Sequence, residues 1–529
     1  MPQLRARRPR RMRIAVVVPA VLALIAVAGG TASRQAPAAD AGPAPLVLTA
    51  DGWVQGTTAG AANEYLGIPY AAPPVGALRW RPPQPAAPWT GFRQADSYAP
   101  HCPQPESDFG VASTSENCLY LNVFAPARGR GGDLPVMVWL HGGSLLVGES
   151  DDYNPAALVR DGVVVVTVNY RIGALGFLAD TALAGRPGAP AGDYGLMDQQ
   201  AALRWVQRNI AGFGGDPGNV TLAGESAGGL SVLAQLVSPG ARGLFQRAIA
   251  ESGSYDLTQQ PLAAAEAAGA AFAARVGCAR DTAACLRRLP VTTIIDHEDF
   301  SGYTPDVDGA VLPETIKAAL AAGQFSHVPV IIGSNRDEWR LFVAMARLDG
   351  GPRVTTANYR AMIAATLGVP AAAAAAVAAE YPPGDYSSPS VALGAVGTDA
   401  IFACPELAAE ASLARYTPVY AYEFNDRGAP ERYLGPVGFP YGATHESELQ
   451  YLFSLAGTPY PGTLSAAQQQ LAQTMKLYWT TFARTGAPAA RWPAFTAARQ
   501  QTLSLVPPRP QVETDYAAEH HCSFWSKAG

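Results

Sequence analysis

A serine between two glycines stands where the sequence passes from an apolar run to a Gly- and Ala-rich segment. Residues 224–229 read GESAGG, which places Ser226 at the centre of a G-x-S-x-G pattern. This pattern holds a serine on a tight turn between a strand and a helix, with its hydroxyl free to attack a carbonyl carbon. The preceding VTLAG, residues 220–224, is an apolar strand pattern. N–H groups at the start of the following helix would face the charge that develops on the attacked oxygen. The spacing therefore predicts a nucleophilic serine rather than an ordinary strand–glycine–helix turn.

A serine hydroxyl needs a base to remove its proton and a third group to orient that base. The chain has seven histidines. On this type of turn the chain order is serine, acid, histidine, which excludes His101 and His141 as the base. An acid candidate follows the apolar run VPVIIG, residues 328–333, because ligand sites in open α/β sheets lie beyond the carboxyl ends of the strands. Two carboxylates are adjacent there, Asp337 and Glu338, and only one can serve because neighbouring side chains diverge.

The segments around these residues alternate between strand and helix patterns. Short apolar runs typical of buried parallel strands occupy residues 134–140 and 162–170, and apolar side chains recur at helical spacing over 194–211. An Ala-rich run over 361–380 favours helix, although its composition alone also permits a low-complexity loop. Strands that alternate with helices predict a parallel α/β sheet, and we expect a single α/β domain over residues 46–529.

The first 45 residues differ in composition from the rest. Six arginines within the first 13 residues precede an apolar run from Ile14 to Ala28, which predicts a secretory signal peptide over residues 1–33. Paired arginines leave a twin-arginine export route open. A membrane anchor is disfavoured, because a spanning helix needs about 20 apolar residues and Pro19 interrupts this shorter run. Residues 34–45 are rich in Ala and Pro and are expected to form a flexible lead-in.

The composition as a whole narrows the function. The 529 residues are 48% hydrophobic and 15% charged, with a net charge of −5, so a nucleic-acid-binding protein with a basic face is disfavoured. All six cysteines lie beyond the signal, and an even number in an exported chain favours disulfides. A metal site is disfavoured because no C-x-x-C pair or nearby histidine set gives tetrahedral spacing. The sequence does not indicate an oligomeric state.

Several blocks resemble the type-B carboxylesterase family, which includes cholinesterases, bile-salt lipases and bacterial para-nitrobenzyl esterases. FGGDPGNVTLAGESAGG at 213–229 looks like the signature of that family. Further matching blocks lie at residues 64–83, 116–126, 137–143, 169–178 and 303–313. The resemblance covers the chain from about Leu46 to its end, with Asn117 where the family usually has Asp. It implies an α/β-hydrolase fold, with a large, mostly parallel sheet flanked by helices. It also implies ester hydrolysis by a serine, an acid and a histidine, without metal or cofactor.

The resemblance also implies which residues complete the triad. His445, in GATHESELQYLF, matches the catalytic-histidine block, and Glu338 matches the catalytic acid. This leaves Asp337 as a loop or surface carboxylate. Glu448 and Ser252 would belong to a supporting hydrogen-bond set behind the triad.

The oxyanion hole and the disulfides are likewise implied by the resemblance. The N–H groups of Gly143, Ser144 and Ala227 would form the hole. The family commonly has HGGGF where this chain has HGGSL, and a backbone donor survives that change. Trp339 stands where the family usually has Gly, so a different loop geometry is expected there. The implied disulfides are Cys102–Cys118, Cys278–Cys285 and Cys404–Cys522.

Two rival functions remain at this stage. A triacylglycerol lipase on the same scaffold would need an apolar lid, whereas the segment between Cys102 and Cys118 is short and polar. A non-catalytic adhesion or binding member would lack a triad residue. In the cholinesterases that the chain resembles, a tryptophan of the first disulfide loop binds the quaternary ammonium. Phe109 is the only aromatic residue in the corresponding segment here, so we expect short-to-medium acyl esters of uncharged alcohols to be preferred over choline esters. Trp339 or Trp139 could supply a ring instead.

Overall fold

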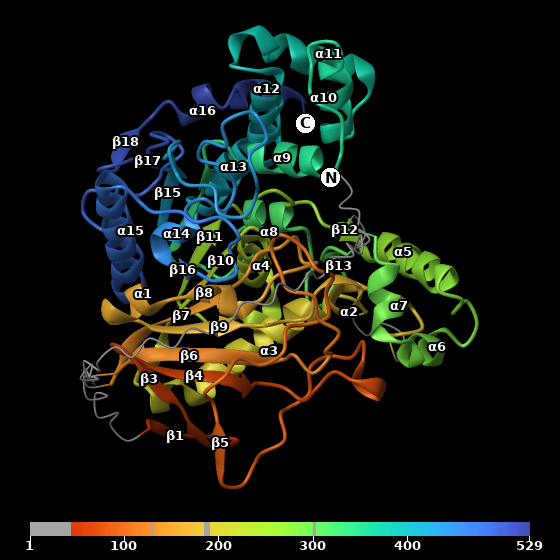
Figure 1. The fold of residues 1–529 in the computed structure, drawn as a ribbon, viewed down its shortest axis with the longest axis vertical. Helices are drawn as coiled ribbons and strands as arrows, with labels where there is room; N and C mark the ends of the chain where they lie inside the picture. Colours follow the sequence, from red (N-terminus) through yellow and green to blue (C-terminus); the bar gives the residue numbers. More distant parts are fainter. Residues whose placement is uncertain (1–43, 128–131, 185–190, 300–302, 529) are drawn as a thin grey trace, which may run out of the picture.

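The computed structural model describes residues 44–127, 132–184, 191–299 and 303–528. The expected signal peptide and most of the expected lead-in lie outside the described residues. A twisted sheet of 11 strands crosses the molecule (Figure 1). In spatial order its strands are β18 (Gln511–Glu513), β17 (Thr502–Leu505), β15 (Val419–Phe424), β14 (Val330–Asn335), β11 (Arg247–Glu251), β10 (Gly215–Glu225), β7 (Leu134–Leu140), β9 (Val164–Val168), β6 (Tyr120–Pro126), β4 (Ala62–Pro69) and β3 (Thr57–Ala59).

The central strands of this sheet run parallel and the outer ones antiparallel. Neighbours from β17 to β9 pair parallel, whereas β18 at one end and β6, β4 and β3 at the other pair antiparallel. The predicted α/β sheet is therefore confirmed, and the apolar runs over 134–140 and 162–170 form two of its central strands. Because parallel strands end at the same edge, the residues that follow β10 and β14 are brought together.

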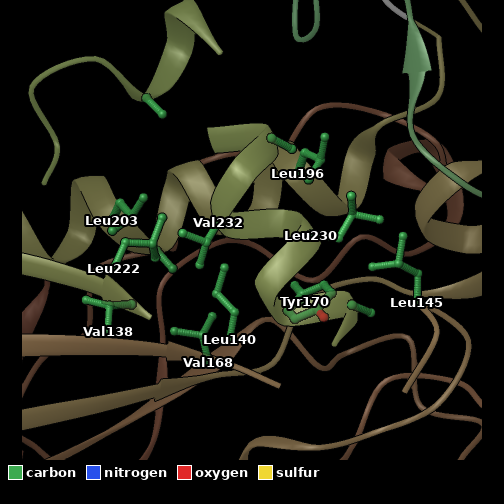
Figure 2. Packing of buried hydrophobic residues seen from close by; sticks show 14 of the residues in the cluster. Val138, Leu140, Leu145, Val168, Tyr170, Leu196, Leu203, Leu222, Leu230 and Val232 are labelled. Atoms are coloured by element: carbon green, nitrogen blue, oxygen red, sulfur yellow. The ribbon is translucent and has the colours of Figure 1, made fainter. Parts of the chain in front are cut away.

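Both faces of the sheet are buried, which explains the continuous apolar runs in its strands. In β7, Val136, Val138 and Leu140 belong to one hydrophobic cluster, and Met137 and Trp139 between them belong to another. Figure 2 shows helices α3 (Tyr194–Asn209) and α4 (Ala227–Val237) covering the first face with Leu196, Leu203, Leu230 and Val232. On the second face, α15 (Ala466–Thr485) contributes Met475, Trp479 and Phe482.

The Ala-rich run forms two helices instead of one. Helix α10 (Tyr359–Leu367) ends at Gly368, whose φ of 65° is the left-handed conformation typical of a helix end. Pro370 then precedes α11 (Ala371–Glu380), and the chain bends by 112° between α10 and the segment Ala371–Asp385. Alanine favours helix throughout this run, so the break comes from Gly368 and Pro370.

Helices α10 and α11 pack with α9 (Arg340–Leu348) and α12 (Pro389–Gly397) at the top of the view in Figure 1. Helix α12 continues through the π-helix η6 (Thr398–Ala403) into α13 (Cys404–Leu413). This continuous helix, Pro389–Leu413, is long and apolar enough to cross a membrane, but 67% of its most apolar window is buried inside the protein. That burial is typical of a core helix.

Trp339 lies just before α9 and packs against the end of α12. Its backbone N–H donates to the Thr398 hydroxyl at 3.0 Å. A Cβ atom added to Gly397 would lie 2.1 Å from Cγ of the Trp339 ring. The ring therefore occupies space that only a glycine at position 397 leaves open, which explains how the chain accommodates a tryptophan beside the expected acid.

Three disulfides connect Cys102 with Cys118, Cys278 with Cys285, and Cys404 with Cys522. These are the pairs that the family resemblance implies. The last one fixes the C-terminal segment to the start of α13, across a sequence separation of 118 residues.

Candidate active site

Ser226 lies on the turn between β10 and α4, in a backbone conformation that is rare for a residue with a side chain. Its φ and ψ are 54° and −118°. The N–H of Ser226 donates to the carbonyl of Glu251 at 2.8 Å, which fixes the turn to the next strand. A Cβ atom at Gly228 would lie 2.0 Å from the Leu140 carbonyl oxygen, so glycine is required for the helix to start this close to β7.

Two hydrogen bonds connect the three residues that the sequence singles out. His445 Nε2 lies 2.8 Å from Ser226 Oγ, and His445 Nδ1 lies 2.5 Å from Glu338 Oε2. Ser226, Glu338 and His445 are 6%, 0% and 3% exposed, so the bonds are shielded from bulk water. An acyl-transfer triad requires these two hydrogen bonds, one from the nucleophile to the base and one from the base to the acid.

Asp337 and Glu338 serve different partners, although they are adjacent in sequence. Asp337 pairs with Arg340 at 2.7 Å and with Arg427 at 3.2 Å, and it accepts the N–H of Ala443 at 3.1 Å. It is only 5% exposed, so the expected loop position is right, but a surface position is wrong. Burial raises the pKa of Asp337, and the charges of Arg340 and Arg427 offset that effect only in part.

A hydrogen-bond set holds Glu338 from behind. Its Oε1 accepts the Ser252 hydroxyl at 2.6 Å and the Asn335 N–H at 2.7 Å. The Asn335 side chain donates to Glu448 and, at 2.8 Å, to the carbonyl of Thr444. Ser252 and Glu448 thus belong to one set, joined through Asn335 rather than directly. Sequence reasoning missed Asn335, and its only signal there is its place at the end of the strand before the acid.

The pKa of His445 reflects two opposing effects. Burial lowers the pKa of this histidine, and the neighbouring Glu338 carboxylate raises it through charge and hydrogen bonding. The net result is a pKa above its ordinary value of 6.5. Glu338 therefore stabilises the imidazolium form that a general base must pass through.

Sequence reasoning also missed Glu225, which directly precedes Ser226 in the chain. Its Oε1 lies 3.3 Å from His445 Nε2, and neither of its oxygens has a hydrogen-bond partner among the described residues. Burial, followed by repulsion from Glu446, Glu448 and other acids, raises its pKa well above the ordinary 4.5. Both effects disfavour the charged form of Glu225.

Glu225, His445 and Glu446 also present ligand atoms within 4.8 Å of one another. A cation held by this group would compete with Ser226 for the same imidazole nitrogen, because His445 Nε2 already contacts the Ser226 hydroxyl. This geometry favours proton transfer over metal binding.

The three expected oxyanion-hole residues lie around the nucleophile. Gly143 and Ser144 line a small cavity of about 40 Å³ together with Ser226 and His445, and Ala227 is the first residue of α4. Gly143 and Ser144 have φ angles of 97° and 57°. Within the described residues, the N–H groups of Gly143, Ser144 and Ala227 donate to no protein acceptor, which leaves them free to bind a substrate oxygen.

The rest of this cavity is mainly apolar. Phe109 reaches it from the segment between Cys102 and Cys118, and α9 contributes Leu341, Phe342 and Met345. Neither Trp139, which is fully buried in β7, nor Trp339 lines it. The fold and this geometry are those of an α/β-hydrolase.

Comparison with known proteins gives the family. The model of the Carboxylesterase family matches residues 43–525, and the chain belongs to this family. The para-nitrobenzyl esterase of Bacillus subtilis (strain 168) is 36% identical over 490 residues, which cover 87% of this chain and 94% of that protein. The acylcarnitine hydrolase of Mus musculus is 35% identical over 486 residues, 85% of each chain. A solved structure of a PNB esterase matches with a TM-score of 0.75 at 34% identity, over 90% of this chain and 98% of that one. The chain is therefore a carboxylic-ester hydrolase.

Proposed function

We propose that this protein is a secreted serine carboxylesterase that works through an acyl-enzyme on Ser226, with His445 as base and Glu338 as acid. The observation that carries the proposal is the buried, unbroken hydrogen-bond chain from Ser226 through His445 to Glu338. A non-catalytic binding protein would have no need for this chain.

The reaction proceeds in two halves. His445 Nε2 takes the proton of the Ser226 hydroxyl as Ser226 Oγ attacks the ester carbonyl, and the same proton then passes to the departing alcohol. Water, activated by His445, hydrolyses the acyl-enzyme in the second half and releases the acid. The free N–H groups of Gly143, Ser144 and Ala227 bind the negative oxygen in both halves. No metal or cofactor takes part.

We further propose that choline esters are poor substrates. A quaternary ammonium group binds best over the face of a tryptophan. The ring that the disulfide-closed loop supplies to the small cavity is Phe109, a weaker partner for a cation. The absence of a large apolar lid in this short polar loop also favours an esterase over a triacylglycerol lipase.

Export is proposed from the N-terminal pattern of basic and then apolar residues. In this proposal residues 1–33 are removed as a signal peptide, and residues 46–529 form one catalytic domain behind the lead-in of residues 34–45. The three disulfides support an oxidising destination. N-terminal sequencing of protein recovered from the medium tests the cleavage.

The experiment for the mechanism is covalent labelling with a fluorophosphonate, followed by peptide mapping. We expect one adduct per chain, on Ser226, and Ser226→Ala should lose both the adduct and at least about 10,000-fold in kcat. Ser231→Ala is the matched control, because Ser231 lies in α4, accepts a hydrogen bond from Gln199 and does not line the cavity at Ser226. A Ser226→Ala protein that still turned over a tenth as fast as the wild type would refute the proposal.

A further inference from the structure

The cavity at Ser226 is too small to hold a substrate. Its volume is about 40 Å³. Pockets that bind small molecules have volumes of about 300–1,000 Å³. At least one arm of the ester must therefore extend into space beyond this cavity.

A second cavity, of about 430 Å³, adjoins the first, and residues of α9 line both cavities. Phe342 lines both cavities, and its ring centroid lies 5.3 Å from that of His445. On one side of Phe342, Leu341 and Met345 face the nucleophile; on the other, Val343 and Ala346 face the larger space. Phe342 is therefore the lining residue that the triad cavity shares with a cavity of ligand size.

The larger cavity combines an apolar lining with positive charge. Its apolar residues include Trp339, Val343, Met362, Leu393 and Phe439. Its charged lining residues are Arg347 and Arg353, both exposed, and no Asp or Glu lines it in the described part of the chain.

The two arginines retain donors for a ligand. Arg347 uses one guanidinium nitrogen for the Gly351 carbonyl, at 3.2 Å. The side chain of Arg353 makes no hydrogen bond or ion pair within the described residues, and its Nη2 lies near Gly438, which also lines the cavity. Guanidinium groups bind carboxylates through paired N–H donors.

We propose that this cavity receives one arm of the ester substrate, an apolar arm that ends in a carboxylate held by Arg353 and Arg347. The inference rests on the proposed function, because the reacting carbonyl must sit at Ser226 while the arm passes Phe342. The arm with the terminal carboxylate can belong to the acid part of the ester, as in a monoester of a dicarboxylic acid. It can equally belong to the alcohol part, as in an ester formed through the hydroxyl of a hydroxy acid.

The experiment compares matched pairs of esters that differ only in the terminal carboxylate. One pair is mono-para-nitrophenyl adipate and para-nitrophenyl hexanoate; the other is the butyrate of 6-hydroxyhexanoate and hexyl butyrate. For at least one pair, Arg353→Gln should lower the ratio of kcat/KM between charged and neutral ester by about three- to tenfold, a typical range for an exposed or partly buried carboxylate pair. The responding pair identifies the arm. The matched control is Arg360→Gln, an exposed arginine of α10 that does not line the cavity and should leave the ratio unchanged.

Ionic strength and Phe342 provide independent readouts. The wild-type ratio for the responding pair should fall as salt is added, because screening weakens exposed charge pairs. Phe342→Ala should raise kcat/KM for para-nitrophenyl octanoate relative to para-nitrophenyl butyrate, since the wall to the larger cavity is removed. Unchanged ratios for both ester pairs in Arg353→Gln would overturn the inference. Failure of the proposed function would give a different result, because esterase activity would then survive the substitution Ser226→Ala.

Discussion

The carboxylates of Asp337 and Glu338 belong to consecutive residues and serve different parts of the molecule. Glu338 contacts the imidazole of His445 at 2.5 Å, whereas Asp337 holds Arg340 at 2.7 Å. One carboxylate holds the imidazole of His445, and the other holds the start of α9 and the segment before His445. Substitutions that remove one charge at a time should therefore have separable effects.

Glu338→Gln should lower kcat by about 1,000-fold or more, because the imidazole loses the group that fixes its tautomer and stabilises its positive form. Asp337→Asn should lower kcat by less than about tenfold and act mainly on stability, since it weakens two ion pairs in a buried site. Steady-state kinetics and thermal unfolding of both variants check this. The reverse order of the two kcat effects would transfer the role of acid to Asp337.

The pH profile of kcat/KM should have its acidic limb above pH 6.5. His445 acts as a base only when neutral, and its pKa lies above the ordinary value, so activity falls as pH drops through that raised pKa. In the residual activity of Glu338→Gln the limb should move to lower pH, because burial then acts without the compensating carboxylate. A limb that stays in place would show that another group controls it.

Gly397→Ala should destabilise the protein, although alanine in a helix usually stabilises by about 1 kcal/mol over glycine. The added Cβ would lie 2.1 Å from the Trp339 ring, and overpacking of this kind costs about 1–3 kcal/mol. In a Trp339→Leu background the same substitution should become neutral or stabilising. The free energies of unfolding of the four proteins form a double-mutant cycle, and additive effects would argue against the contact.

His520 should stabilise the fold up to alkaline pH. Both of its ring nitrogens contact carboxylates at 2.6 Å, Nδ1 with Asp399 and Nε2 with Glu423, and only an imidazolium has two N–H donors. Burial lowers the pKa of His520, but the two carboxylates outweigh it and raise the pKa to about 10. Because the folded pKa exceeds the ordinary 6.5, the stabilisation is complete below pH 6.5 and is lost as pH rises through about 10.

His520→Asn should accordingly lower the free energy of unfolding by about 3–5 kcal/mol at pH 6.5, with a smaller difference from the wild type above pH 10. Thermal unfolding across this pH range measures both effects. The matched control is His521→Asn, because the neighbouring His521 contacts one carboxylate, that of Glu380, in a partly exposed position. A difference that grows with pH would contradict the assignment.

Local patterns were sufficient for the parts of the site that lie in single segments. The turn at Ser226 follows from a strand, two glycines and a helix that are contiguous in sequence, and β7, β10 and β14 are marked by their own apolar runs. The Ala-rich run was ambiguous for the opposite reason: its alanines favour helix throughout, and only Gly368 and Pro370 mark the break.

The remaining features depend on contacts between distant segments. Asp337 pairs with Arg427, which is 90 residues away, and Asn335 donates to Glu448, 113 residues away. The cavity of about 430 Å³ is enclosed by side chains from α9, α10, α12 and the segment around Phe439. No pattern within one segment records such contacts, so the position of Phe342 between two cavities could not be predicted.

The packing of Trp339 on Gly397 also limits the order in which these two positions can diverge. A lineage that replaced Gly397 first would pass through a protein in which a Cβ atom and the indole compete for the same space. A lineage that first exchanged Trp339 for a smaller residue would leave a void next to η6, and Gly397 could then accept a side chain. Substitution of Trp339 should therefore precede substitution of Gly397 as the sequence diverges. Directed evolution that retains the tryptophan should also retain the glycine.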